Sequence, residues 1–343
     1  MQRFMAVCVS LVTIAGAAAV FADDAGPAKD VPELQALQHY HGTWDVAVTD
    51  NEFSTGESTA RWILGGRFLE QAGVMHSKDG KEIGVTTLFT FDTNKKTYRS
   101  WMFFSTGSVS QAEMTWDAKS KTMTSLTRPN ADGVRSTVTA DFSEASQERW
   151  KFVFTDRDGK AAGEMRGVNT LRKDAATTPK PAATAKDFSN RTAELKVLDR
   201  FLGTWRTEYR MPKAEWTPEE KRGSAELVYT RELDGQFIRE RGTDSDKTTT
   251  MITTMLLTFD ADKQNYRGWW FDSLGNTNES TGRWDEASRT LFWTRIEPND
   301  FNNTSQHSFP DSGKFDWKVL VQDKQGVAMF RMEGTSLRVP TKK

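Results

Sequence analysis

The chain has 343 residues, enough for one large domain or two domains of ordinary size. It carries 46 lysine and arginine residues against 47 aspartate and glutamate residues, a formal net charge of −1. This near-neutral balance argues against nucleic acid or an anionic membrane as the main partner.

Residues 1–22 are predicted to be a signal peptide. One early charge, Arg3, precedes a long apolar run, and the small residues Val20 and Ala22 stand three and one positions before the predicted cut. The alternative is an uncleaved membrane anchor, because the run is nearly long enough to span a bilayer. Cleavage would remove Arg3 and Cys8, the only cysteine, and leave a formal charge of −2 and no thiol chemistry. The protein is therefore expected to be exported, to the periplasm or the extracellular space.

Residues 31–172 are predicted to form a domain of short strands. The segment "PELQALQHYH" comes first and is expected to be one or two helical turns that plug a barrel end. Runs such as "TYRSWMFFS" and "ERWKFVFTD" then show a period of two and are rich in Thr, Val and aromatic residues. Because closure removes exposed edges, such a meander is expected to form a barrel. About ten strands are predicted, near 43–49, 58–64, 67–75, 83–91, 97–105, 109–116, 121–127, 134–142, 148–155 and 164–171.

Two glycine-containing stretches are predicted to be hairpin turns. "RWILGGRFLE" places Gly65 and Gly66 between strand-like runs, and "TRELDGQFIR" places Asp234 and Gly235 in the same way. Both dipeptides suit a two-residue turn, which needs positive φ. A phosphate loop would need several spaced glycines, a Lys-Ser or Lys-Thr pair and a following helix. Neither stretch has this combination, so a nucleotide site is excluded there.

Residues 191–339 repeat the first domain. Gly42-Thr43-Trp44 recurs as Gly203-Thr204-Trp205, 161 positions later, and "LFTFDTNKKTYRSWMFF" recurs as "LLTFDADKQNYRGWWFD" after 168 positions. Such ordered matches indicate a tandem duplication. Residues 173–190 between the copies are predicted to be an extended, flexible linker, since "KDAATTPKPAATAKD" has no apolar periodicity. The expected fold is all-β: two tandem antiparallel up-and-down barrels of about ten strands each, with short helical plugs.

The motifs "GTW", "LGGRFLE" and "FDTNKKTYRSW" together resemble the bacterial secreted domain-of-unknown-function family numbered 1579, across each copy nearly end to end. The Gly-x-Trp element is also similar to lipocalins and other calycins. This resemblance implies a calycin-like barrel with an internal cavity, in which Trp44 and Trp205 close one end. It implies no established activity. Related nitrobindins bind haem through a late histidine, but "GEMRGVNTLRK" and "FRMEGTSLRV" contain none, so no cofactor is expected.

No motif assigns a catalytic residue or a metal site. His39 and His41 could share one side of an extended segment, but their counterparts are Arg200 and Leu202 and no third ligand is indicated. No nucleophile elbow, His-Glu-x-x-His helix or Ser-x-x-Lys pair is present. A catalytic pair of carboxylates is kept as an alternative, because a barrel lumen can bring together acidic residues that are distant in the sequence.

The strands "YRSWMFF" and "YRGWWFD" supply the candidate ligand-binding residues. Alternate residues face opposite sides of a sheet, and the face that is identical in both copies is predicted to line the lumen. A lumenal arginine needs a carboxylate, either from the protein or from a bound apolar acid. The candidates are Arg99, Trp101, Phe103, Arg267, Trp269 and Phe271.

Three functions are considered. The preferred one is an exported, non-enzymatic protein that binds a small apolar or amphipathic ligand, carboxylate-bearing ligands included, in one or both barrels. The second is an interaction or surface-binding module with exposed aromatics such as Trp216. The third is an isomerase or cyclase that uses a lumenal acid. Eight extra residues around Arg210–Gly223 predict either a lid, with a short helix after Thr217, or a solvated loop on the second copy.

Overall fold

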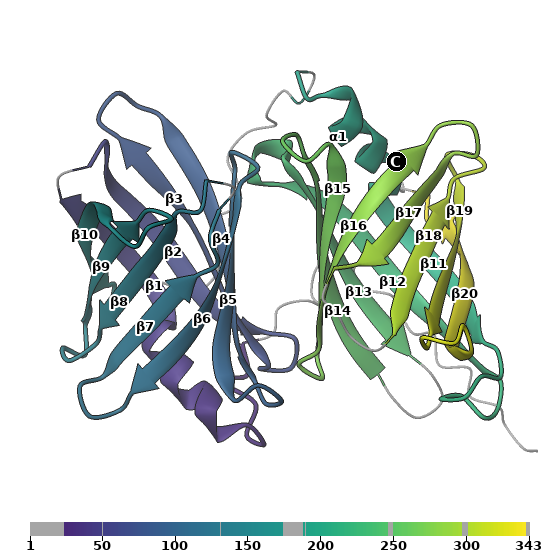
Figure 1. Cartoon of the computed structure of the whole chain (residues 1–343), viewed down its shortest axis with the longest axis horizontal. Coiled ribbons are helices and arrows are strands. Elements are labelled where there is room, and N and C mark those ends of the chain that lie inside the picture. The colour runs from purple at the N-terminus through teal and green to yellow at the C-terminus, as the bar shows by residue number, and fades with distance from the viewer. Residues whose placement is uncertain are drawn as a thin grey trace, which may run out of the picture.

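The computed structural model describes residues 24–340 apart from residues 50, 131, 174–187, 189, 246–249 and 297–300. These residues form two closed antiparallel barrels of ten strands each (Figure 1). The predicted all-β fold of tandem barrels is therefore confirmed. The predicted signal peptide lies outside the described residues, as does most of the predicted linker.

In the first barrel each strand pairs with the next in sequence, and β1 pairs with β10 to close the sheet. The first register pairs across this closure are Trp44 with Leu171 and Asp45 with Thr170. All ten observed strands begin and end within five residues of the predicted ones, and the largest difference is the start of β2 at Phe53. Their bounds are β1 (Gly42–Thr49), β2 (Phe53–Ile63), β3 (Phe68–Ser77), β4 (Glu82–Asp92), β5 (Thr97–Phe104), β6 (Val109–Asp117), β7 (Thr122–Thr127), β8 (Arg135–Asp141), β9 (Gln147–Thr155) and β10 (Ala161–Leu171).

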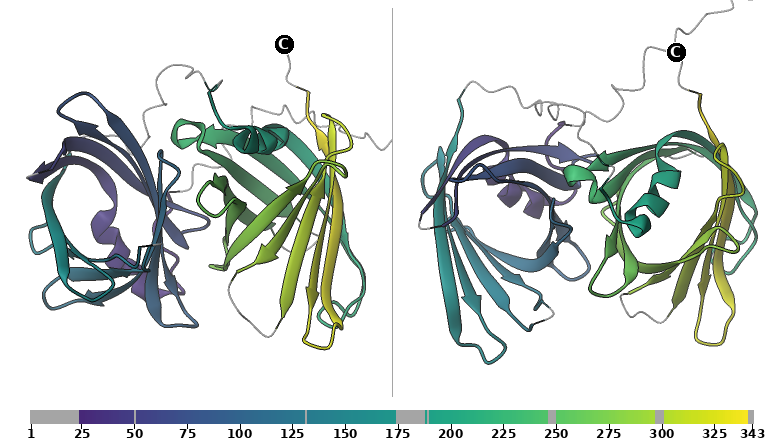
Figure 2. Two further views of the ribbon diagram at one scale, coloured as in Figure 1. Left: turned by 45° about the horizontal axis from the view of Figure 1, so that its top comes forward. Right: turned by 90° about the horizontal axis from the view of Figure 1, so that it is seen from above.

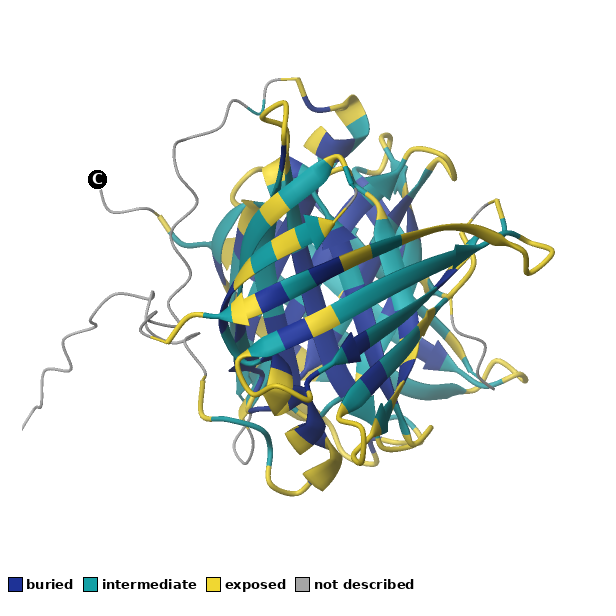
Figure 3. Cartoon of the chain, turned by 90° about the vertical axis from the view of Figure 1, so that its left-hand side faces the viewer, coloured by how far each residue is buried: buried dark blue, intermediate teal, exposed yellow. Residues whose placement is uncertain are grey.

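The second barrel has the same topology, and β11 pairs with β20 to close it. Buried, intermediate and exposed residues alternate along many strands of the molecule, as a sheet with one buried face requires (Figure 3). The strand bounds are β11 (Gly203–Met211), β12 (Lys221–Glu232), β13 (Phe237–Ser245), β14 (Thr250–Asp260), β15 (Asn265–Asp272), β16 (Thr277–Asp285), β17 (Thr290–Arg295), β18 (Asn302–Ser308), β19 (Lys314–Gln322) and β20 (Ala328–Arg338).

Short helices plug one end of each barrel, as predicted. The 3₁₀ helix η1 (Pro32–Tyr40) precedes β1, whereas α1 (Ala193–Leu198) and the 3₁₀ helix η2 (Asp199–Phe201) precede β11. Thr192 caps α1 by accepting a hydrogen bond from the Leu195 amide at 3.3 Å. Figure 2 shows α1 lying across one end of the second barrel. The buried side chains that these helices contribute are Leu34, Ala36, Leu37 and Tyr40 in the first barrel and Leu195, Leu198 and Phe201 in the second.

The tryptophans of the Gly-Thr-Trp motifs lie beside these plugs. The Trp44 indole N–H donates to the Tyr40 carbonyl oxygen at 2.7 Å, and the Trp205 indole N–H donates to the Phe201 carbonyl oxygen at 2.5 Å. Both rings are almost fully buried. Each indole therefore fixes the last residue of its plug to the first strand of its barrel.

The glycine turns are longer than the predicted two-residue hairpins. Four residues connect β2 to β3, and the 3₁₀ turn η3 (Leu233–Gly235) followed by one further residue connects β12 to β13. Three successive residues in each connection have positive φ: Leu64, Gly65 and Gly66, and likewise Leu233, Asp234 and Gly235. Positive φ is unusual for leucine. Both leucines pack in the contact between the barrels, and this burial offsets the backbone strain.

The two barrels pack directly against each other, which the sequence did not predict. In Figure 1, β4 and β5 face β14 and β15. The buried side chains at this contact form one cluster, the inter-barrel cluster: Ile63, Leu64, Phe68, Leu88, Trp101, Phe103, Phe237, Leu256, Trp269 and Phe271. Among the described residues, no helix has the length and apolar character needed to cross a membrane.

Candidate functional site

The six candidate ligand-binding residues lie between the barrels and not in the lumens. Trp101, Phe103, Trp269 and Phe271 belong to the inter-barrel cluster. Trp101 packs edge-on against Phe271, with ring centroids 5.1 Å apart, and Phe103 packs in the same way against Trp269 at 5.3 Å. The predicted lumenal placement is therefore wrong. This face is identical in both copies because each copy presents it to the other.

The two arginines of this face pair with protein carboxylates. Arg99 lies 3.5 Å from Asp92 in its own barrel, and Arg267 lies 3.4 Å from Asp260 and also bonds to Glu279. Each guanidinium also lies over a tryptophan ring, at 4.6 Å for Arg99 on Trp101 and 5.0 Å for Arg267 on Trp269. Ligand binding by the six residues stays an untested prediction, and it would require the barrels to separate.

The strand register identifies the side chains that do face the lumens, since residues paired across a ladder share one face. In the first barrel the inward-facing residues nearest the plug are fully buried, among them Trp62, Leu69 and Phe89. Farther from the plug, the inward-facing apolar residues are only half-buried, so solvent reaches them. These are Val46, Val48, Met75, Ile83, Val85, Met102, Phe104, Val138, Phe152, Phe154 and Met165.

The second barrel shows the same gradient with different side chains. Its inward-facing residues near α1, such as Ile238, Leu257 and Phe315, are buried. The half-buried apolar residues toward the opposite end include four methionines, whose unbranched side chains adapt to ligands of different shape. They are Met211, Leu227, Met251, Met255, Trp270, Val319, Phe330 and Met332.

The eight extra residues of the second copy border this open end, but they contain no helix. Residues 212–220 connect β11 to β12, and Ala214 and Thr217 form a bridge through both of their backbone amides. This bridge uses the backbone groups that a helix after Thr217 would need, so the predicted helix is wrong. The Trp216 amide donates to the Met329 carbonyl oxygen at 2.8 Å, and the Trp216 ring packs against Phe301 at 4.8 Å. Trp216 remains 52% exposed at the rim.

A buried acid, Glu148 of β9, lies at the plugged end of the first barrel. Asn169 of β10 donates to Glu148 at 2.6 Å and accepts a hydrogen bond from the Trp150 indole at 2.9 Å. Burial raises the pKa of Glu148 to about 7, although the hydrogen bond from Asn169 lowers it. Burial and the proximity of Glu148 hold the pKa of Tyr40 well above its usual value.

The second barrel has its buried acid at a different place. Tyr229 donates to Glu240 at 2.8 Å, and Thr253 donates to the other carboxylate oxygen at 3.1 Å. Burial raises the pKa of Glu240 above its usual value, while these two hydrogen bonds lower it. The first barrel has Gln71 at the position equivalent to Glu240, and the second has Phe315 at the position equivalent to Glu148. The two lumens therefore differ chemically.

The structure does not bring the histidine pair together. His41 bonds to Asp24 at 2.9 Å, whereas His39 stacks on Trp116 and Phe142 at 5.0 and 5.5 Å. Within the described ranges, no group of three or more His, Cys, Asp or Glu side chains is placed to hold a metal ion. Burial lowers the pKa of His307, in the second lumen, to about 4, so its imidazole is neutral at pH 7.

The outer wall of the second barrel carries an open depression of about 1050 Å³. Its lining has three basic residues (Arg210, Arg222 and Lys318) and three acidic ones (Glu208, Asp316 and Glu333), and Arg210 lies 2.5 Å from Glu333. Ion pairs of this exposed kind contribute little energy and leave little net charge for a partner. This depression is therefore a weaker candidate than the lumens.

Comparison with known proteins gives a family match for the second copy but no activity. Residues 190–327 match the model of a family described as proteins of unknown function, DUF1579, which confirms the resemblance for the second copy. No match is found among curated proteins.

Three solved structures are distantly similar to parts of the chain or to most of it. The S-type phycobiliprotein lyase CPES from Guillardia theta has 13% identity over 43% of this chain and 93% of its own, with a TM-score of 0.32. A DUF3598-family protein of unknown function from Nostoc punctiforme PCC 73102 has 11% identity over 89% and 98%, with a TM-score of 0.27. CghA with Sch210972 has 9% identity over 88% of each chain, with a TM-score of 0.20. At these values the likenesses carry no argument about function.

Proposed function

We propose that the protein binds a small, neutral, apolar or amphipathic molecule in the lumen of one or both barrels. The supporting observation is the set of inward-facing apolar side chains that stay half-buried away from the plugs. Contiguous apolar surface that water reaches is uncommon unless a ligand or partner covers it, and small barrels commonly hold one ligand.

The charge of the first lumen supports a neutral ligand over an acidic one. Among its described inward-facing residues there is no lysine or arginine, and the polar ones apart from Glu148 are mostly hydroxyl and amide side chains such as Ser58, Gln71 and Ser125. The buried acid Glu148 adds to this bias. A carboxylate there would lack a cationic partner and would lose its hydration.

The test is titration with the neutral dye N-phenyl-1-naphthylamine, whose fluorescence rises in an apolar site. Phe152→Ser is expected to weaken binding roughly tenfold or more, because a buried phenylalanine contributes about 1.5–3 kcal/mol. Val153→Ser is the matched control: the neighbouring residue is also half-buried but faces outward. It is expected to leave the affinity within about twofold.

The same assay tests the ligand class. Decanol is expected to displace the dye better than decanoic acid does at neutral pH. Absence of dye binding, or equal weakening by both variants at unchanged thermal stability, would contradict a lumenal site. Better displacement by the acid would contradict the neutral class alone.

We also propose export with removal of residues 1–22, since this segment has the charge and small-residue pattern of a signal peptide. Expression of the full chain in a bacterial host should give a periplasmic or secreted protein whose first residue is Asp23, measured by mass spectrometry. A full-length product retained in the cytoplasm or the inner membrane would contradict this.

A further inference from the structure

The contacts between the two barrels occur in exchanged pairs. Residues of β5 and β6 correspond to residues 168 positions later, and residues around the glycine turn to residues 169 positions later. Trp101 packs on Phe271, and the equivalent exchange, Phe103 on Trp269, is also present. Phe68 lies 5.5 Å from Phe271, and the exchanged contact, Phe103 to Phe237, measures 5.6 Å. Such reciprocity is the property of an isologous, two-fold interface.

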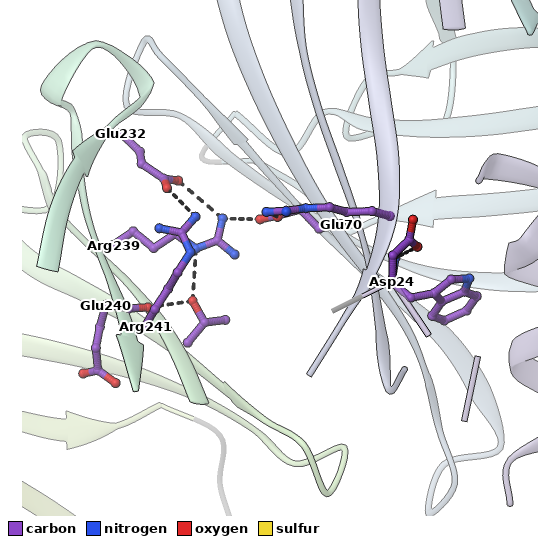
Figure 4. A network of polar contacts seen from close by, with 9 residues as sticks. Asp24, Glu70, Glu232, Arg239, Glu240 and Arg241 are labelled. Atoms are coloured by element: carbon purple, nitrogen blue, oxygen red, sulfur yellow. Dashed lines mark hydrogen bonds and ion pairs between the residues drawn. The ribbon is translucent and has the colours of Figure 1, made fainter. Parts of the chain in front are cut away.

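A pseudo-two-fold axis therefore runs between the barrels. Only on that axis does a residue meet its own equivalent, and two such hydrogen-bonded contacts are found among the described residues. Glu70 bonds to Arg239, which is 169 positions later (Figure 4). Gln111 donates to Glu279, 168 positions later, at 2.8 Å. The duplication has placed different residues on the two sides of the axis at both points.

The charges at these axial positions are buried. Glu70 and Arg239 are 3% and 2% exposed, and Glu279 is 6% exposed. If two first barrels met through this face, Glu70 would lie opposite a second glutamate. If two second barrels met, Arg239 would lie opposite an arginine and Glu279 opposite a glutamate. Buried like charges cost several kcal/mol, whereas the observed pairing is complementary.

We infer that the inter-barrel face is a heterotypic docking surface: the first barrel's face binds the second barrel's face and rejects a copy of itself. The aromatic contacts supply the affinity but not the choice of partner, because they are the same for any combination of barrels. The axial residues supply the choice of partner, because at these positions each residue meets its own equivalent, so exchanging one barrel replaces a complementary pair with two identical residues.

The Gln111–Glu279 position gives a second test, because each barrel has an equivalent arginine there, although Arg128 of the first barrel also lies 3.7 Å from Glu279 and has Ile296 as its equivalent. Arg267 bonds to Glu279 within the second barrel, and Arg99 is the equivalent arginine beside Gln111. Gln111→Glu alone would place two glutamates on the axis. Gln111→Glu combined with Glu279→Gln would move the acid across the axis to the other arginine.

The experiment uses the full chain with a protease site inserted between residues 174 and 187, cut after folding. The cut wild-type protein is expected to stay a one-to-one complex in size-exclusion chromatography. Gln111→Glu is expected to weaken this association at least tenfold, and the double exchange should recover most of it. Arg239→Glu should weaken association by a hundredfold or more, whereas Arg149→Glu, which changes the same charge at an exposed site, should not.

Three outcomes would overturn the inference. The first is that the two halves of the cut wild-type protein separate at micromolar concentration. The second is that the two substitutions at 111 and 279 weaken association additively. The third is that like halves pair as readily as unlike halves. Near-ultraviolet circular dichroism before cutting identifies any variant that fails to fold. If Arg239→Glu fails to fold, the comparison of Gln111→Glu with the Gln111→Glu, Glu279→Gln double variant decides the outcome.

Discussion

Replacing Arg239 with methionine is expected to destabilise the protein by about 3–5 kcal/mol, the usual cost of removing one partner from a buried ion pair. Glu70 would keep its contact with Arg61 at 3.2 Å but would lose its partner across the inter-barrel contact. Arg239 also bonds to Thr254 at 3.0 Å and lies 3.4 Å from Glu232, so both would lose a contact. Chemical unfolding at pH 7 measures the effect.

The double variant Glu70→Gln, Arg239→Met is the control, because it removes both charges. It is expected to be more stable than Arg239→Met alone. A single variant as stable as the wild type would contradict the assignment of this pair as buried and coupled.

The same pair makes the wild type sensitive to acid. Burial raises the pKa of Glu70, but attraction to Arg239, Arg241 and Arg61 outweighs it and lowers the pKa from 4.5 to about 2. The folded state therefore binds the proton less readily than the unfolded state does. The resulting stability, about 3 kcal/mol for this shift, is present above pH 4.5 and is lost as the pH falls toward 2. This dependence should shrink in the Arg239 variant.

Glu148→Gln is expected to stabilise the protein by up to about 3 kcal/mol at pH 8. Burial raises the folded-state pKa of Glu148 from 4.5 to about 7, so the folded state holds its proton longer than the unfolded state. Stability at this site is full below pH 4.5, falls as the pH rises to 7, and is constant above it. Glutamine keeps a hydrogen-bonding partner for Asn169 and carries no charge.

Unfolding of both proteins between pH 4 and 8 measures this effect. The variant should lose the decline in stability between pH 4.5 and 7, and the two curves should converge at pH 4. Glu144→Gln, an exposed acid on the same hairpin, is the matched control and should leave the decline in place. A decline that persists in Glu148→Gln would show that another group causes it.

The strands could be predicted because their signal is local. Alternation of apolar and polar residues predicted a strand at 43–49, and the observed β1 is Gly42–Thr49. The duplication then carried the same prediction to the second barrel. The closing roles of Trp44 and Trp205 came from the resemblance, and the structure places both beside their plugs.

The candidate site was placed wrongly because the prediction considered each barrel alone. Identity of Trp101 and Trp269 shows that the two positions share an environment, but a lumen and a mutual contact satisfy that condition equally. The alignment of the two copies sets Glu70 opposite Arg239, but an alignment does not show that two equivalent residues meet. Glu148 gave no signal from the repeat, because Phe315 replaces it. Its place on the same strand face as the aromatic residues Trp150, Phe152 and Phe154 of β9 was the only available clue.

The plugs lie at opposite ends of the paired barrels: η1 at the lower end of the first and α1 at the upper end of the second (Figure 1). This follows from the pseudo-two-fold axis, which runs across the barrel axes, so the unplugged ends also face opposite ways. A flat surface that delivers or receives a ligand, such as a lipid bilayer or the face of a large protein, can therefore touch only one opening at a time. To exchange a ligand with both barrels, such a surface must either meet the molecule from two sides or wait for it to turn over by half a rotation.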